Sequence, residues 1–223
     1  MTPDQFFALI EGDQIAVAIA ALDGDPELGR SRNAEGLSPL AVAAYWGRHD
    51  LVELLRDRIG PQDLWDAAIA GDTGGAAGFI TGDPELVRSL SPDGFTALHL
   101  AAFFGQPETV GLLIENGADV GAWTSNTFHN QPLHAAVAGS SAPTRLAIAR
   151  MLLEAGADPG AQQSDGSTPL MSAARHGDDA LVDLLVAAGA DLATRDEGGR
   201  SAADHANEAG HDAIAERLTP VGD

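Results

Sequence analysis

The sequence predicts an all-α protein, a solenoid in which about seven helical hairpins stack side by side. Short segments recur along its 223 residues at a spacing close to 33. Each recurring segment contains an apolar run with the period of a helix. One such segment is too short to bury its apolar face alone, so neighbouring segments have to stack.

The recurring segments are marked at both ends. Gly-Ala-Asp follows an apolar helical run at 117–119, 156–158 and 189–191, which are 39 and 33 residues apart. Ahead of such runs stand four related stretches: "SPLAVAA" from Ser38, "TALHLAA" from Thr96, "QPLHAAV" from Gln131 and "TPLMSAA" from Thr168. A base period of 33 with short insertions accounts for these spacings.

Each segment is predicted to hold two helices. Ser38-Pro39 and Thr168-Pro169 place an N-cap hydroxyl before a proline at the first helical position, which starts a helix. A glycine follows after about two turns and is expected to end that helix; these glycines are Gly47, Gly105, Gly139 and Gly177. Acidic residues then favour the start of the second helix; they are Asp50, Glu108, Asp178, Asp179 and Asp212.

A longer period adds segments without the usual opening turn. Asp25-Pro26 recurs as Asp83-Pro84, 58 residues later. The stretch "IGPQD" is then predicted to be a tight connector. It replaces the longer loop, or finger, that joins other successive hairpins. We therefore expect one domain over 1–223, with hairpins at 3–30, 33–60, 62–90, 93–122, 126–160, 163–192 and 196–219. Irregular spots remain at 122–131 and in the insertion at 140–143.

These motifs resemble ankyrin repeats, whose signature is T-P-L-H-x-A on a period near 33. Leu98-His99, Leu133-His134 and Thr168-Pro169-Leu170 carry the resemblance, which covers almost the whole chain. Ala41 and Met171 depart from it where histidine is usual. The resemblance implies an ankyrin-repeat solenoid with short β-turn fingers and a protein partner bound on its concave face and fingers.

Composition narrows the partners and the chemistry. The formal net charge is -21, and all 12 basic residues are arginine. Nucleic acid and anionic membranes are poor partners for such a chain, whereas a basic protein is attracted to it. Without cysteine or lysine, there is no thiolate zinc site, Schiff base or P-loop. We expect a cytoplasmic monomer without cofactor or metal, and the lysine-free, Ala- and Gly-rich composition suggests a bacterial source.

Adjacent aromatic residues precede two of the glycines. Phe103 and Phe104 lie on the side of their helix opposite the face that meets the second helix, and Tyr45 and Trp46 have the same phase. Such residues either pack between hairpins or contact a partner. We expect Trp46 and Phe104 to face a partner and Tyr45 and Phe103 to lean towards packing.

Other candidates lie on the fingers and in a later hairpin. Phe95, Trp123 and Phe128 lie on finger segments, where they either shield loops or serve as anchors for a partner. Arg175 and His176 occupy the place of the aromatic pairs further along the chain. These nine residues form the predicted partner-binding set.

The sequence gives only weak indications of a catalytic site. Asp72-Thr73-Gly74 matches the triplet of aspartic proteases, which need two copies to bring two carboxylates together, but only one copy occurs. The pattern also fits Asp72 as a helix N-cap. The seven histidines show no metal-ligand spacing. We predict a protein-binding module without catalytic activity. The alternative is an acidic inhibitor or immunity-type protein that blocks a basic enzyme acting on nucleic acid, and a hydrolase using Asp72 ranks last.

Overall fold

The computed structural model describes residues 1–139 and 141–219. These residues form fourteen α-helices and two short 3-10 helices, with no strand beyond one isolated antiparallel bridge between Leu90 and Thr96. The predicted all-α class and its helical hairpins are therefore confirmed. The chain divides into two compact parts, unit 1 (Met1–Ala97) and unit 2 (Leu98–Asp223), which are described separately.

Unit 1 contains three helix pairs. Its helices are α1 (Pro3–Glu11), α2 (Ile15–Gly24), α3 (Pro39–Tyr45), α4 (His49–Arg58), α5 (Leu64–Ala70) and α6 (Thr73–Gly82), and the 3-10 helices η1 (Pro26–Arg30) and η2 (Pro84–Arg88) follow α2 and α6. The first helices of successive pairs pack together, α1 on α3 and α3 on α5. Phe6, Ile10 and Leu51 are among the fully buried side chains of this unit.

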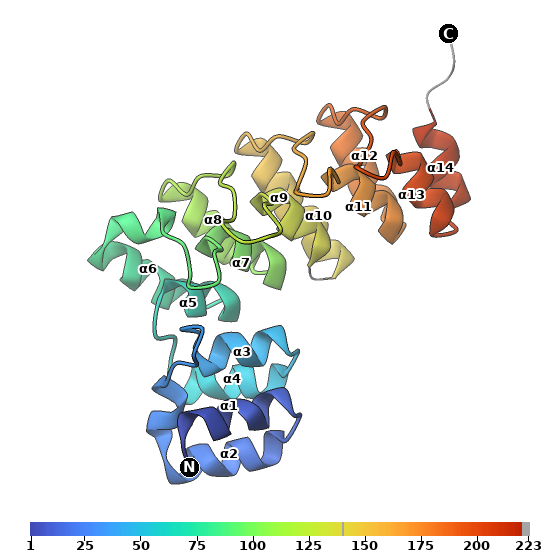
Figure 1. Cartoon of the computed structure of the whole chain (residues 1–223). Coiled ribbons are helices and arrows are strands. Elements are labelled where there is room, and N and C mark those ends of the chain that lie inside the picture. Colours follow the sequence, from blue (N-terminus) through green and yellow to red (C-terminus); the bar gives the residue numbers. More distant parts are fainter. Residues whose placement is uncertain (140, 220–223) are drawn as a thin grey trace. The chain divides into compact units, whose positions relative to one another are not determined.

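Unit 2 repeats the arrangement with four pairs. Its helices are α7 (Ala97–Phe104), which begins at the boundary, α8 (Pro107–Glu115), α9 (Pro132–Ala138), α10 (Ala142–Glu154), α11 (Pro169–His176), α12 (Asp179–Ala187), α13 (Ala202–Glu208) and α14 (Asp212–Leu218). Successive pairs stack in chain order, as Figure 1 shows. Leu113, Leu133 and Leu152 are among the fully buried side chains of this core. Residue 140 of the predicted insertion lies outside the described residues.

Hydroxyl and carboxylate caps start the helices as the sequence indicates. Ser38 Oγ accepts a hydrogen bond from the Ala41 amide at 3.0 Å, and Thr168 Oγ1 accepts one from the Met171 amide at 3.3 Å. Such side-chain acceptors satisfy amides that have no partner inside the helix.

The glycines after the first helices do not all serve the same purpose. Gly47, Gly105 and Gly177 have φ of +66°, +74° and +69°, a region that favours glycine. Gly139 instead has φ of -85°. A Cβ there would lie 1.9 Å from the carbonyl oxygen of Phe103, so close backbone approach, and not a left-handed turn, requires this glycine.

Buried histidines tie the first helices of unit 2 to the following fingers. His99 Nε2 lies 3.1 Å from the carbonyl oxygen of Asn130, and His134 Nε2 lies 2.9 Å from that of Ala161. A carbonyl only accepts, so each Nε2 carries a proton and donates. Burial lowers the pKa of His99 to about 4 and also lowers that of His134, so both rings are neutral at pH 7.

Unit 1 has a buried carboxylate at the shortened connector before α5, where the finger is missing. Asp66 on α5 accepts hydrogen bonds from Oγ of Ser38, the N-cap of α3, and, at 3.1 Å, from the Gln62 amide. Burial and the neighbouring Asp63 raise the pKa of Asp66 to about 6. This contact links two successive first helices across the shortened connector.

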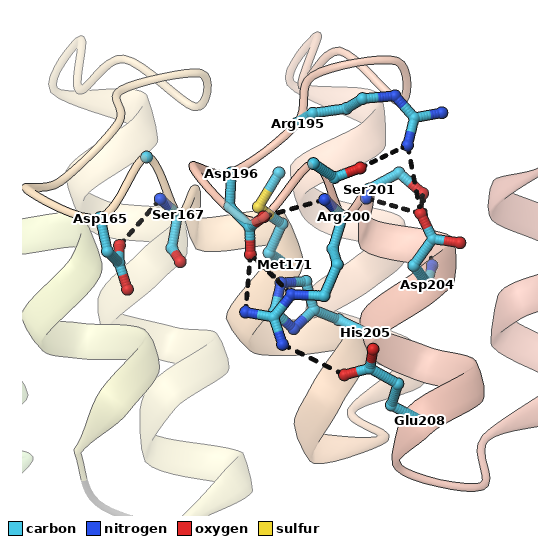
Figure 2. Close-up of polar contacts among 12 residues, drawn as sticks. Asp165, Ser167, Met171, Arg195, Asp196, Arg200, Ser201, Asp204, His205 and Glu208 are labelled. Atoms are coloured by element: carbon cyan, nitrogen blue, oxygen red, sulfur yellow. Dashed lines mark hydrogen bonds and ion pairs between the residues drawn. The ribbon is translucent and has the colours of Figure 1, made fainter.

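An ionic network joins the finger before α13 to that helix (Figure 2). Asp196 Oδ2 accepts from Arg200 Nη2 and from His205 Nε2, both at 2.9 Å, and Arg200 Nη1 reaches Glu208 Oε2 at 3.2 Å. Burial opposes ionisation of Asp196, but its bonds from the Arg200 backbone, His205 and the guanidinium lower its pKa to about 2. The network fixes the turn that leads into α13.

Candidate functional site

The first aromatic pair lies at the end of α3. Tyr45 is the last residue of this helix, and Trp46 caps it through its amide, which donates to the Val42 carbonyl at 3.0 Å. Tyr45 is 39% exposed and Trp46 52% exposed. Trp46 is thus the more exposed ring of this pair.

Tyr45 also makes a specific polar contact within unit 1. Its hydroxyl donates to Asp93 Oδ2 at 2.6 Å, which joins the end of α3 to the finger before α7. Partial burial and this carboxylate raise the pKa of Tyr45 because both disfavour the phenolate. Phe95, on the same finger, is half-buried, and its amide donates to Ser91 Oγ at 3.0 Å.

The second aromatic pair ends α7. The Phe103 and Phe104 rings meet edge to face, with centroids 5.1 Å apart and an interplanar angle of 83°. Phe103 is 42% exposed, whereas Phe104 is half-buried. Phe103 therefore presents more surface than Phe104, although Phe104 is the ring that the sequence suggests as the partner contact. Helical phase places the pair opposite the second helix but does not say which ring is covered by its neighbour.

The lengthened finger between α8 and α9 carries the other exposed rings. The Thr124 amide donates to the Asn130 carbonyl at 3.0 Å, which closes the finger. Trp123 stacks on His129 with centroids 4.6 Å apart and planes 10° from parallel. Trp123 is 39% exposed and Phe128 59% exposed.

His129 was missed in the sequence and belongs to this site. Its ring lies against Trp123, while its backbone has a φ of +42°, an unusual conformation for a residue other than glycine. The repeat pattern gives no signal for this stack, since the extra residues of the finger have no counterpart in the other hairpins.

Arg175 and His176 are both exposed at the end of α11. Partial burial, together with the charges of Arg145 and Arg175, lowers the pKa of His176. Arg145 Nε lies 3.6 Å from Asp178 Oδ2, so the positive charge of Arg145 is balanced by this carboxylate. This place is polar, as its sequence indicates.

The structure groups the predicted residues within each unit. Tyr45, Trp46 and Phe95 belong to unit 1, where Tyr45 is bonded to the finger that carries Phe95. The other six belong to unit 2; they are Phe103, Phe104, Trp123, Phe128, Arg175 and His176. The Gly139 contact brings the end of α9 against the Phe103 backbone.

The described residues offer little for other kinds of site. Asp72 caps α6, because its Oδ1 accepts from the Gly75 amide at 2.8 Å. Within 1–139 and 141–219, no three His, Asp or Glu side chains gather as ligands for a metal ion. Over the same residues, no helix has both the length and the apolar character needed to cross a bilayer.

Comparison with known proteins decides the family. A sequence profile described as "Ankyrin repeats (3 copies)" matches residues 64–163 and again residues 143–222, well over half of the chain. The chain belongs to the ankyrin-repeat family. Ankyrin repeats are protein–protein interaction modules. The profile matches begin at α5, and the structure shows the same helix-pair plan in the two earlier hairpins.

Several animal proteins are similar to this ankyrin-repeat chain. Mouse ankyrin repeat and SOCS box protein 16 is 43% identical over 40% of the chain and 20% of its own length. The mouse B-cell lymphoma 3 protein homolog is 33% identical over 74% of the chain and 33% of its own length. The Drosophila melanogaster neurogenic locus Notch protein is 32% identical over 72% of the chain and 5% of its own length. The chain thus spans a third or less of these relatives, which give no support to a bacterial origin.

Proposed function

We propose that this ankyrin-repeat chain binds another protein through the aromatic ends of α3 and α7 and through its fingers. One observation carries the proposal. The chain has three Trp, one Tyr and seven Phe, all within the described residues. Five of these rings are exposed, and all five belong to the predicted partner-binding set; they are Tyr45, Trp46, Phe103, Trp123 and Phe128.

Exposed aromatic rings favour this function over a purely structural one. Aromatic residues are enriched at protein interfaces, where a few of them supply much of the binding energy. Phe6 and Phe7, in contrast, are buried in unit 1, so the chain does place rings in its core where packing requires them.

The proposed partner is basic, because a net charge of -21 attracts positive surfaces and speeds their association. Asp72 caps α6, and the proposal gives it no catalytic role. Monomeric state, a cytoplasmic location and a lack of nucleic-acid binding stay predictions from composition. The relatives give no support to the alternative function as an inhibitor of a nucleic-acid enzyme.

Affinity capture from the source cell, followed by identification of the retained protein, tests the proposal. We expect a partner that is retained at low salt and captured less at high salt. Trp46→Ala and Phe103→Ala should each reduce its capture. Val17→Ala and Val186→Ala are matched controls, because these side chains are also apolar and exposed but lie outside the predicted set. Equal capture by all four variants would contradict the proposal.

A further inference from the structure

The fingers of unit 2 are joined to one another by hydrogen bonds. The Ser164 amide donates to the Phe128 carbonyl at 3.1 Å, and the Glu197 amide donates to the Asp165 carbonyl at 3.0 Å. Gln162 Nε2 adds a bond to the Arg195 carbonyl at 3.2 Å. We call the three joined fingers (119–131, 158–167 and 191–200) the finger ridge. Because successive fingers are bonded, the ridge is a continuous surface along which an extended segment can lie.

One end of the ridge is aromatic. His129 covers one face of the Trp123 indole, and Phe128 beside it is the most exposed large apolar side chain in the described chain. The stack fixes the orientation of the indole before any partner binds. A preorganised ring loses less conformational entropy on binding.

The adjoining part of the ridge is acidic. Asp165 follows Ser164, which is bonded to Phe128, and Glu197 is bonded to Asp165 through the backbone; both side chains are exposed. Burial opposes ionisation of Asp165, but hydrogen bonds from Ser167 and Gln163 lower its pKa, so the carboxylate is charged at pH 7. Two arginines lie in the last finger, and both are already bonded within the chain. Arg195 Nη1 donates to the Gly199 carbonyl at 2.7 Å, and Arg200 donates to Asp196 and Glu208.

We propose that the finger ridge binds an extended segment of a protein that carries arginine or lysine, with one cationic side chain on the Trp123 ring and others facing Asp165 and Glu197. Cations bind best to the face of Trp among aromatic rings, and exposed carboxylates attract the remaining positive charges. The proposal rests on the proposed function and adds to it the chemistry of the partner and the place where it binds.

Titration of the intact chain with short synthetic peptides tests the proposal. The probes are repeats of Gly-Arg-Ser, and of Gly-Gln-Ser as the uncharged match. The indole N–H signals of the three tryptophans report binding by NMR, and Trp65, whose indole nitrogen is buried, is the internal control. We expect the Trp123 signal to shift saturably with the arginine peptide and the Trp65 signal to stay in place.

Two sets of variants locate the contact. Trp123→Leu keeps an apolar side chain and should weaken arginine-peptide binding about fivefold, the scale of an exposed cation–π contact. Asp165→Asn combined with Glu197→Gln leaves Trp123 intact and should weaken binding and reduce its salt dependence. Glu154→Gln with Glu216→Gln removes the same charge from exposed places elsewhere and should leave the affinity unchanged.

Other outcomes would overturn the inference. Equal affinity for the arginine and glutamine peptides would show an apolar site without a preference for cations. A shift of Trp123 that depends on protein concentration alone would show that a second copy of the chain occupies the ridge. The peptides can fail to discriminate between arginine and glutamine while capture of the partner still depends on Trp46 and Phe103. That result would refute this inference and leave the proposed function standing. Equal capture by the aromatic and valine variants would end the proposed function itself.

Discussion

At the scale of single residues, Tyr45 offers a clean readout because it is the only tyrosine in the chain. Its hydroxyl is bonded to Asp93, and partial burial with this carboxylate raises its pKa. Tyrosinate absorbance should therefore appear above the usual pKa of about 10. Asp93→Asn should move the midpoint part of the way back, and the unfolded chain should titrate normally. A native midpoint at the ordinary value would contradict the contact.

Exposed and buried apolar side chains should also differ in what they contribute to folding. Phe128→Ala should lower the free energy of unfolding by about 1 kcal/mol or less, as for most surface substitutions. Leu133→Ala, at a fully buried position in the same unit, should cost about 2–5 kcal/mol. Urea denaturation measures both. A similar loss for the two variants would mean that the finger ring is part of the core.

At the scale of elements, substitution by asparagine should distinguish the roles of the two glycines at the ends of α3 and α9. Gly47 needs only a left-handed backbone, which asparagine tolerates, and a Cβ there would meet nothing within 4 Å. Gly139 has no room for a Cβ against the Phe103 carbonyl. Gly47→Asn should therefore cost well under 1 kcal/mol, and Gly139→Asn at least about 1–3 kcal/mol. Thermal unfolding of both variants checks this, and equal losses would refute the distinction.

The sequence predicts these elements well and their tertiary contacts poorly. Caps, prolines and glycines are local signals, so Ser38-Pro39 and Thr168-Pro169 start their helices as expected. The bond between Ser38 and Asp66, and that between Asp196 and His205, join side chains from different elements or turns. The repeat pattern carries no information about them, because they depend on which side chains the folded chain brings together.

At the scale of the molecule, the two units should respond oppositely to acid. In unit 2, His99 has a folded pKa of about 4 against 6.5 unfolded, so its contribution to stability is lost as pH falls from 6.5 towards 4. In unit 1, Asp66 has a folded pKa of about 6 against 3.8, so folding gains stability as pH falls from about 6 to 3.8.

Hydrogen exchange, corrected for intrinsic rates, separates the two responses. Between about pH 7 and about pH 5, protection should fall in α7 and α9 and rise in α3 and α5. Asp66→Asn keeps an acceptor for Ser38 but cannot ionise, so it should remove the rise in unit 1. The same change in both units would contradict this assignment.

Much of the whole-molecule plan follows from the sequence, because one repeating period requires successive hairpins to stack. The candidate site follows less well. The five exposed rings are all among the predicted residues, yet the order of Phe103 and Phe104 and the stack of Trp123 on His129 depend on tertiary packing. Neither can be read from helical phase.

The most direct measurement is the affinity of the chain carrying both Trp46→Ala and Phe103→Ala for its captured partner, by calorimetry and per folded molecule. We expect a loss of at least about 2 kcal/mol, the scale of interface hot spots. The matched double variant Val17→Ala with Val186→Ala should bind like the original chain. Undiminished affinity of the aromatic variant would contradict the central claim that these exposed rings bind the partner.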